Sequence, residues 1–480
     1  MNRRMVFYTV GRISLAAAVL LLLPALVSLI YLESCGWSFL ITIAIALALS
    51  GALTRLSRPS SDVIYAREGF AIVALGWLLT ALLGALPFFL SGEIPSFIDA
   101  FFESVSGLTT TGASILTDVE SLSHGILFWR SFTHWIGGMG VLIFIMAIIP
   151  NLADRSIHIV RAEMPGPVVG KLVPRVKDTA KILYIIYIAM TLVQIAFLLF
   201  GGMSLFESIV HAFATAGTGG FGIKADSIAG YSPYLQWVIT VFMLIFGVNF
   251  NLYYLILVRR ARSALRSGEL WCYIGIVAVS TVVILFNILP QFGSAGEALR
   301  HSAFQVASII STTGYSTADF NLWPGLSKGI LFLLLFIGGC AGSTAGGLKM
   351  SRAIMLVKMV GREFRRMLHP RSVSTVRFEG KSVDTSTLGS VSTYFVIYMI
   401  CIFAVFLLIS PEPFGFETNF SAAVTCFNNV GPGFAMVGPT GSFAAYSGFS
   451  KLVLSMAMLL GRLEIFPLIL ALSPRSWIKK

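Results

Sequence analysis

Apolar residues in this chain are gathered into long runs that are separated by short polar segments. Many of these runs exceed the roughly 18–20 residues that a helix needs to cross the hydrocarbon core of a bilayer. The first two extend from about Ile13 to Tyr31 and from Trp37 to Leu53, with a short loop between them. The pattern therefore predicts an all-α polytopic membrane protein that begins with a two-helix extension over residues 1–60.

After this extension, one unit occurs four times: a long apolar helix, a shorter and less apolar segment, a polar glycine turn, and a second long helix. The short segments have roughly 10–14 residues, too few to span, so each is predicted to be a re-entrant half-helix. Two helices plus four pairs give ten predicted spans. The predicted units are residues 61–151, 175–266, 268–370 and 385–480, with re-entrant loops at 97–116, 204–223, 296–318 and 416–434.

The four polar turns align on one glycine each, at intervals of about a hundred residues. Non-helical backbone at membrane depth is tolerated only where it is buried in protein or lines a watery cavity. Carbonyls from four such turns could replace the water around a cation, and glycine permits the positive φ that the turn requires. The aligned glycines are Gly112, Gly219, Gly314 and Gly431.

The turns contain no carboxylate, which favours a monovalent cation held by dipoles over a divalent cation held by charges. For any single turn, close helix packing of small residues is an equal alternative. Four turns at the same place in four units favour an ion filter instead. The residues that precede the glycines are Thr110 and Thr111, Gly217 and Thr218, Thr312 and Thr313, and Asn429 and Val430.

Charge adds an orientation to this picture. The formal net charge is +12, and the basic residues cluster in alternate loops, whereas the loops between them are mildly acidic. The positive-inside rule places the basic loops and both termini in the cytoplasm, and nothing indicates a nucleic-acid partner. Four glutamates near the starts of the short segments are interpreted as helix N-terminal charges in preference to a cation-attracting vestibule. These are Glu103, Glu207, Glu297 and Glu417.

A second glycine-rich stretch, "GGCAGSTAGGLK", interrupts an apolar helix at residues 338–349. Each glycine disfavours a helix by about 1 kcal/mol relative to alanine, so we expect a break here, with a flexible kink as the alternative. Arg462 is a charge inside the last apolar run, and such residues are usually functional and paired. Glu464 is the nearest partner in sequence, but at i+2 it faces elsewhere on a helix. Arg130 is expected to pair or to snorkel, without a role in transport.

Other chemistry finds no support in the sequence. The five cysteines are scattered, without metal-ligand spacing, and no nucleotide-binding motif occurs. His134 and His211 have no nucleophile or base at a spacing that suggests catalysis. We therefore expect neither an enzyme nor an organic cofactor in this chain.

The motifs "SGLTTTGAS", "GTGGFG", "STTGYST" and "NNVGPGF", with "WRSFTHWIGGMG" and "GGCAGSTAGGLK", resemble the Trk/Ktr/HKT superfamily of potassium transporters. The resemblance covers nearly the whole chain, and the two additional N-terminal helices are more similar to the Trk type than to the Ktr type. It implies a potassium-channel-like pseudo-fourfold pore for K⁺ uptake across the bacterial inner membrane. A K⁺ symporter coupled to H⁺ or Na⁺ is the alternative.

Specific residues follow from the resemblance. The filter would be formed by Thr110, Thr111, Gly112, Gly217, Thr218, Gly219, Thr312, Thr313, Gly314, Asn429, Val430 and Gly431. The gate would be an intramembrane loop with Gly338, Gly339, Gly342, Ser343, Thr344, Gly346, Gly347 and Lys349, and with Arg462 beside it as an electrostatic barrier. Because only the glycine is common to all four turns, we expect looser selectivity than in potassium channels, with Rb⁺ and Na⁺ also passing.

The resemblance also implies partners. Family members are similar in working as homodimers with a cytosolic ring of nucleotide-binding TrkA-type subunits that moves the gate. The basic cytoplasmic loops are a candidate docking surface for that ring, and anionic membrane lipid is the competing partner for the same charges.

Overall fold

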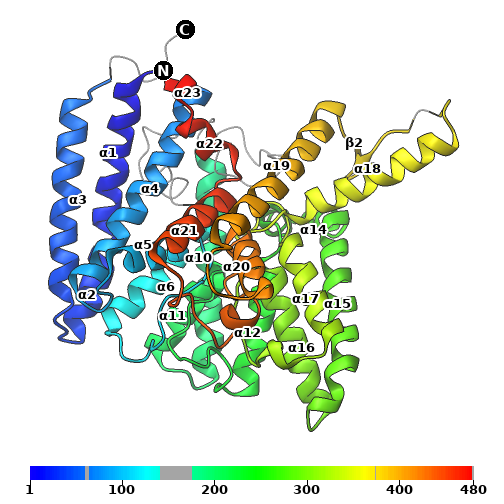
Figure 1. Cartoon of the computed structure of the whole chain (residues 1–480), viewed down its shortest axis with the longest axis horizontal. Coiled ribbons are helices and arrows are strands. Elements are labelled where there is room, and N and C mark those ends of the chain that lie inside the picture. The colour runs from blue at the N-terminus through cyan, green and yellow to red at the C-terminus, as the bar shows by residue number, and fades with distance from the viewer. Residues whose placement is uncertain (60–63, 141–175, 373, 478–480) are drawn as a thin grey trace.

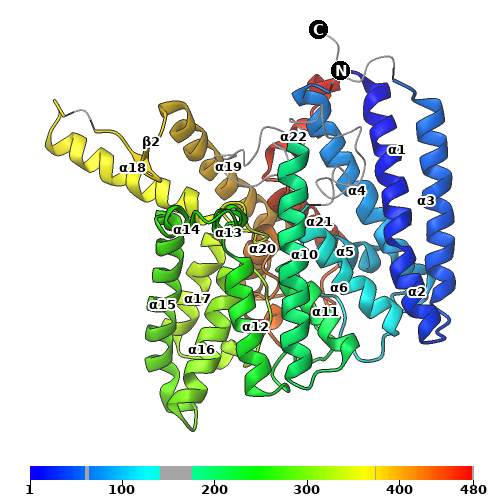
Figure 2. The ribbon, with the colours of Figure 1, turned by 180° about the vertical axis from the view of Figure 1, so that it is seen from behind.

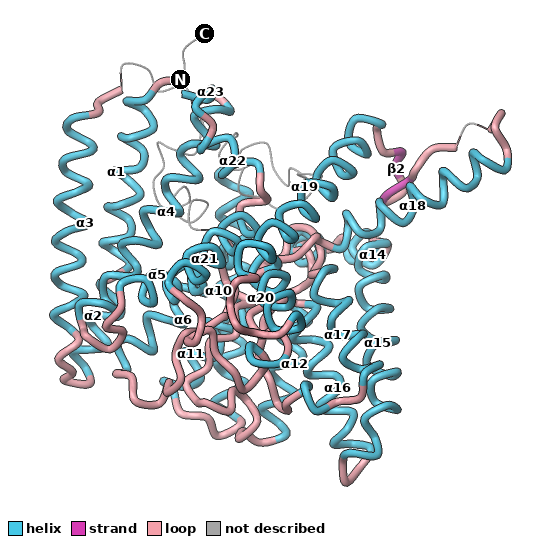
Figure 3. The backbone as a smooth tube through the Cα atoms, viewed as in Figure 1, coloured by secondary structure: helices cyan, strands magenta, loops and turns pink. Residues whose placement is uncertain are grey.

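The computed structural model describes residues 1–59, 64–140, 176–372 and 374–477. Within these ranges the chain is helical apart from loops and one small hairpin, β1 (Arg377–Phe378) with β2 (Lys381–Ser382). The predicted all-α class is therefore confirmed. The long helices run side by side, and many of the connecting loops gather in the centre of the molecule (Figure 3).

Six helical segments in the described ranges are long and apolar enough to cross a membrane. They are α1 (Arg3–Leu20) continued by α2 (Leu22–Ile30), α3 (Gly36–Leu56), α4 (Ala66–Leu90), α10 (Val176–Phe200), α15 (Gly268–Ile288) and α19 (Thr385–Ile409). Two further pairs are apolar enough only together and are sharply bent. These are α12 (Pro233–Phe246) with α13 (Phe250–Leu257), at 90°, and α21 (Gly448–Arg462) with α22 (Phe466–Leu472), at 119°. The described residues thus provide six to eight spans, and the ten predicted ones are not confirmed.

The difference lies in the second helices of the first and third units. In the first unit, α6 (His124–Gly138) covers the start of the predicted span, whose remainder at residues 141–150 lies outside the described residues. In the third unit, α17 (Gly325–Ile337) is only 13 residues long because it ends at Gly338, where φ is +73°. Helix resumes at α18 (Met350–Leu368). The break predicted from the glycines is confirmed, and it leaves α17 short.

Four shorter helices precede the polar turns: α5 (Phe97–Leu108), α11 (Leu205–Ala216), α16 (Ala295–Ile310) and α20 (Phe416–Asn428). Serine hydroxyls cap the first three by accepting the amide N–H three residues on, an arrangement that stabilises a helix by about 1 kcal/mol. Glu207 and Glu297 donate those amides in α11 and α16, and Glu417 lies in the first turn of α20. Their predicted position at helix N-termini is correct.

The remaining segments are short. They are α14 (Ala261–Leu265), α23 (Pro474–Trp477) and the 3₁₀ turns Leu289–Gln291, Phe320–Leu322 and Ala435–Val437.

Both ends of the described chain lie at the same end of the molecule (Figure 1). The Arg3 guanidinium donates a hydrogen bond of 3.2 Å to the Trp477 carbonyl, which ties α1 to α23. Helices α1 and α3 form one flank, and α18 projects from the opposite flank, as Figures 1 and 2 agree. Figure 2 shows the helices of the second and third units, α10 to α17, from their own side.

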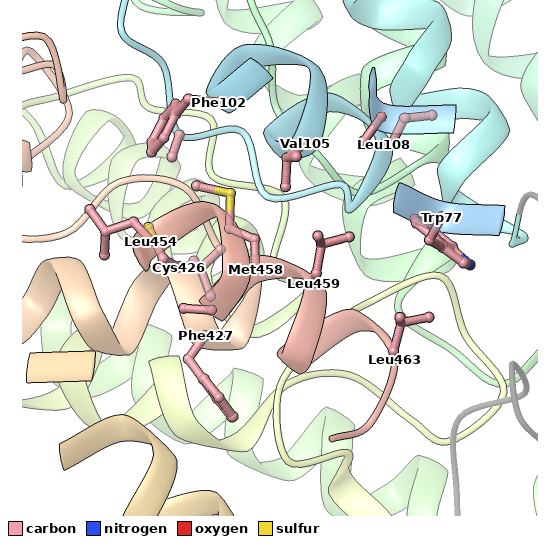
Figure 4. Close-up of a cluster of buried hydrophobic side chains, with 14 of the residues drawn as sticks. Trp77, Phe102, Val105, Leu108, Cys426, Phe427, Leu454, Met458, Leu459 and Leu463 are labelled. Atoms are coloured by element: carbon pink, nitrogen blue, oxygen red, sulfur yellow. The ribbon is translucent and has the colours of Figure 1, made fainter. Parts of the chain in front are cut away.

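The first and fourth units meet in the core of the molecule. Leu454 and Met458 of α21 pack close to Phe102 and Val105 of α5, and all four side chains are fully buried (Figure 4). Trp77 of α4 lies at the edge of this cluster. Packing of α5 on α21 brings the two ends of the repeated array together, so the four units form a closed arrangement rather than an open row.

Candidate functional site: a ring of four turns

The four turns that follow the short helices share one backbone conformation. Each has a residue other than glycine at positive φ, followed two residues later by a glycine at positive φ. Positive φ is strained for a β-branched residue such as threonine, by roughly 1–2 kcal/mol, so its recurrence shows a conformation imposed by the surroundings. The pairs are Thr110 (+57°) and Gly112 (+80°), Thr218 (+54°) and Gly220 (+74°), Thr312 (+56°) and Gly314 (+86°), and Asn429 (+56°) and Gly431 (+100°).

The hydrogen bonds of the turns repeat in the same register. In each turn the amide between the two positive-φ residues donates to the carbonyl five residues earlier. These bonds are Thr111 to Ser106 (2.8 Å), Gly219 to Ala214 (2.9 Å), Thr313 to Ser308 (2.8 Å) and Val430 to Thr425 (3.0 Å).

Both observations correct the predicted alignment of the second turn by one residue. Gly220, not Gly219, is equivalent to the glycines of the other three turns, and Gly219 is equivalent to Thr111. Gly217 falls outside the shared conformation, because it is the C-cap of α11 with φ −70°. The sequence "GTGGFG" contains adjacent glycines, and only the backbone dihedral angles distinguish them.

The turns contact one another in chain order and close into a ring. A Cβ placed on the glycine of each turn would lie closer than 3.0 Å to a carbonyl oxygen of the next turn, a distance that real Cβ atoms essentially never show. The structure thus brings all four predicted turns together, and side chains are excluded at four equivalent contacts. These are Gly112 against Gly219, Gly220 against Thr313, Gly314 against Val430, and Gly431 against Thr111.

Side chains reinforce this ring without adding charge to it. Asn429 Nδ2 donates to Thr111 Oγ1 at 2.9 Å and to the Met458 carbonyl at 3.0 Å, so the fourth turn is fastened to the first and to α21. The hydroxyls of Thr111 and Thr313 pair with hydroxyls two residues earlier in their own turns, at 2.8 and 2.7 Å. These hydroxyls therefore hold the shape of the turns. A cavity of about 240 Å³ is lined by the positive-φ glycine of every turn.

The glycine-rich loop at residues 338–349 lies directly against this ring. The Gly346 amide donates to Thr312 Oγ1 at 2.7 Å, and a Cβ on Gly346 would collide with the Asn428 carbonyl. The loop therefore contacts the third turn and the end of α20. Its other side is fastened to the bend between α12 and α13, where the Cys340 amide donates to the Gly247 carbonyl at 2.9 Å.

Arg462 connects this loop to the first unit. Its Nη1 donates to the Thr344 carbonyl at 3.0 Å, and its Nη2 donates to the carbonyls of Gly137 and of Gly138, the latter at 2.7 Å. The last carbonyls of a helix carry partial negative charge, which favours a cation there. Glu464, the nearest acidic residue in sequence, forms an ion pair with Arg352 of α18 at 2.5 Å.

Two residues beside the ring have roles that the sequence analysis did not assign. Glu103 lies in the middle of α5, fully buried, so its interpretation as a helix N-terminal charge is wrong. It accepts a hydrogen bond of 2.8 Å from Arg130 Nε, which confirms the expectation that Arg130 is paired. The sequence could have indicated this pair, because Glu103 and Arg130 are charged residues of opposite sign within apolar segments on either side of the first turn.

Comparison with known proteins places the chain in a family. The sequence model of TrkH, described as a cation transport protein, matches residues 36–479. The chain belongs to the TrkH family. It is 37% identical over 487 residues to the Trk system potassium uptake protein TrkH of Salmonella typhimurium, with 99% of this chain and 100% of that protein covered. It is 33% identical over 482 residues to TrkG of Escherichia coli K12, covering 99% and 98% of the two chains.

The fold of this TrkH-family chain matches a solved structure, that of the potassium transporter TrkH from Vibrio parahaemolyticus. The TM-score is 0.90 at 32% identity, and all of both chains is covered. The resemblance inferred from the turn motifs is therefore confirmed. Family membership and the apolar helices together show a multi-pass membrane protein of the transporter class.

Proposed function

We propose that this chain takes up K⁺ through a gated, channel-like pore whose selectivity filter is the ring of four turns. The single observation that carries the proposal is the closure of the ring, in which each turn contacts the next through a glycine and a carbonyl. Relatives over the full length are named potassium uptake proteins, which supports K⁺ as the transported ion.

Coordination in this proposal comes from backbone dipoles. Rings of carbonyls replace the hydration shell of a K⁺ ion in potassium-selective filters, and the four turns carry no carboxylate that would favour a divalent ion. Since the turns also carry no side chain that titrates near neutral pH, coupling to H⁺ is not part of the proposal. With the corrected register, the proposed filter consists of Thr110–Gly112, Thr218–Gly220, Thr312–Gly314 and Asn429–Gly431.

The proposed gate is the loop at residues 338–349, with Arg462 as a barrier to cations. Its support is position: Gly346 contacts the third turn, and Arg462 binds the Thr344 carbonyl of the same loop. Opening would require the loop to leave the ring, which breaks the hydrogen bond from the Gly346 amide to Thr312 Oγ1.

The cellular setting also belongs to the proposal. We place the chain in the bacterial inner membrane with both termini in the cytoplasm, in accord with the clustered basic loops. The Trk-system names of its relatives support a partner subunit of the TrkA type. Assembly of this chain as a homodimer, and nucleotide binding by a ring of TrkA-type subunits, are part of the proposal. Anionic lipid remains a second partner for the basic loops.

The test is current through purified protein in planar bilayers under bi-ionic K⁺/Na⁺ conditions. We expect a reversal potential displaced from zero in the direction of K⁺ selectivity, by an amount that gives the K⁺/Na⁺ permeability ratio and that a pH step does not change. Gly314→Ser, which places a side chain against the Val430 carbonyl at positive φ, should shift that potential toward zero. Gly329→Ser is the matched control, because a Cβ at Gly329 meets nothing within 4 Å. Selectivity that survives Gly314→Ser would place the filter elsewhere.

A further inference from the structure

One buried ion pair stands directly behind the ring. Glu103 of α5 is 0% exposed and Arg130 of α6 is 2% exposed, and their charged atoms are 2.8 Å apart. In addition, Glu103 accepts hydrogen bonds from Ser114 Oγ at 2.9 Å and from the Ile115 amide at 3.1 Å. Both donors belong to the segment that leaves the first turn, so the carboxylate holds that segment to α5.

The guanidinium holds the equivalent segment of the second turn. Arg130 Nη1 donates to the Gly222 carbonyl at 3.0 Å, and the guanidinium carbon lies 3.9 Å from the centre of the Phe221 ring. Ser114 and Gly222 each follow the positive-φ glycine of their turn by two residues. The pair therefore joins the two segments that lead directly from the contact between Gly112 and Gly219.

We propose that the Glu103–Arg130 pair is a positioning element that sets the ion selectivity of the pore by bracing the junction of its first and second turns. The inference rests on the proposed filter. A filter that discriminates by cavity size must resist contraction around the smaller Na⁺ ion. A buried ion pair whose two partners hydrogen-bond to different segments fixes the distance between those segments. Such structural specificity is the best-supported reason for a protein to retain a buried ion pair where apolar residues would also fit.

This brace is not repeated around the ring. In the corrected register, the position of Glu103 corresponds to His211, Gln305 and Ala422 in the other short helices. His211 forms hydrogen bonds with the hydroxyls of Tyr315 and Tyr231, each at 3.1 Å. In the part of the chain that the structure describes, only the first junction has an ion pair at this position. Removal of the pair should therefore loosen one side of the filter.

The experiment compares K⁺/Na⁺ permeability ratios in bilayers for Arg130→Met, Glu103→Gln and Arg130→Lys. We expect the first two to lower the ratio at least ten-fold, which moves the bi-ionic reversal potential by about 60 mV. Arg130→Lys keeps the charge but has no planar fork to reach Glu103 and Gly222 together, so it should lie between these variants and the unmodified protein.

Lys451→Met provides the matched control. Lys451 of α21 pairs with Asp99 of α5 at 2.6 Å, so it too ties α5 to another helix through a largely buried charge. That pair makes no hydrogen bond to the turns among the described contacts. We expect Lys451→Met to lower thermal stability while leaving the permeability ratio unchanged. Arg130→Lys and Lys451→Met together separate loss of positioning from general weakening of the fold.

Two results would overturn the inference. One is a folded, conducting Arg130→Met or Glu103→Gln protein with an unchanged ratio, and the other is an equal fall in Lys451→Met. Should single removal prevent folding because it leaves a buried charge unpaired, the double variant Glu103→Leu with Arg130→Met removes both charges and decides the question by the same ratio. If the unmodified protein does not select K⁺ over Na⁺, the proposed function is wrong. If it selects K⁺ and the Glu103 and Arg130 variants have the same permeability ratio, only the proposed role of the ion pair is wrong.

Discussion

The corrected register of the second turn makes a sharp prediction, because two adjacent glycines should respond differently to the same change. Gly220→Ala puts a methyl group on a residue with φ +74° and directs it at the Thr313 carbonyl. Gly219→Ala puts the same group at ordinary φ, where the three nearest atoms all belong to the His134 ring. The new methyl group therefore meets the backbone of the third turn in Gly220→Ala, but only a side chain, which a second mutation can remove, in Gly219→Ala.

The magnitudes follow from these contacts. An alanine in the left-handed region is disfavoured by about 1–2 kcal/mol. In addition, the Thr313 carbonyl oxygen would lie 2.0 Å from the new methyl group and has to move by about 1.4 Å to reach an ordinary contact distance of 3.4 Å. A misplacement of about 1 Å in a site that depends on geometry is enough to lower its efficiency by about 100-fold. Gly220→Ala should therefore abolish selective K⁺ flux. Gly219→Ala should impair it through displacement of His134, and His134→Ala in the same protein should restore part of it.

The assay is ⁸⁶Rb⁺ influx into vesicles that contain equal amounts of folded protein, with Na⁺ as the competing ion. His134→Ala alone is the control for the double variant, and Gly220→Ala with His134→Ala tests whether the rescue is specific to the position next to the histidine. Normal selective flux in Gly220→Ala, or rescue of both glycine variants by His134→Ala, would show that the assigned register is wrong.

Two further predictions concern the proposed gate and the loop that contains Glu33. Arg462→Gln removes a positive charge beside the glycine-rich loop and should raise ⁸⁶Rb⁺ influx about ten-fold, which corresponds to ~1.4 kcal/mol of barrier. Arg462→Lys keeps the charge and should leave the influx unchanged. Unchanged influx in Arg462→Gln would show that Arg462 is not a barrier to cations. Burial acts to raise the pKa of Glu33, but hydrogen bonds from the Gly125 and His124 amides prevail and hold it below 4.5. Because the folded pKa is lowered, this stabilisation is complete above pH 4.5 and is lost as the pH falls through the folded pKa. The thermal unfolding midpoint of Glu33→Gln should therefore change less between pH ~6 and pH ~3 than that of the unmodified protein. Equal changes in the two proteins would contradict the lowered pKa of Glu33.

Much of the architecture could be predicted from hydropathy and glycine placement. The all-α class and the helix break before Lys349 follow from local composition, and the structure has both. The number of spans does not follow in the same way, since an apolar run has the same hydropathy whether it is straight or bent. The segment from Gly448 to Leu472 reads as one long helix but bends by 119° at Leu463 to Ile465.

The candidate site shows a different limit. The second turn could not be aligned from its sequence, because neighbouring glycines are chemically identical and differ only in φ. Glu103 was misassigned for a related reason. A carboxylate near the start of a short helix usually stabilises the helix terminus, and only the three-dimensional packing shows Arg130, 27 residues away, beside it.

The ring is completed by residues from opposite ends of the chain. Asn429 and Thr111, whose side chains join the last turn to the first, are 318 residues apart. A protein is synthesised from its N-terminus, so three turns are made before the fourth has left the ribosome. The proposed conduction path therefore requires that the last unit has packed against the first. Under the proposed function, a partly synthesised chain would have no complete ring and hence no selective path for ions.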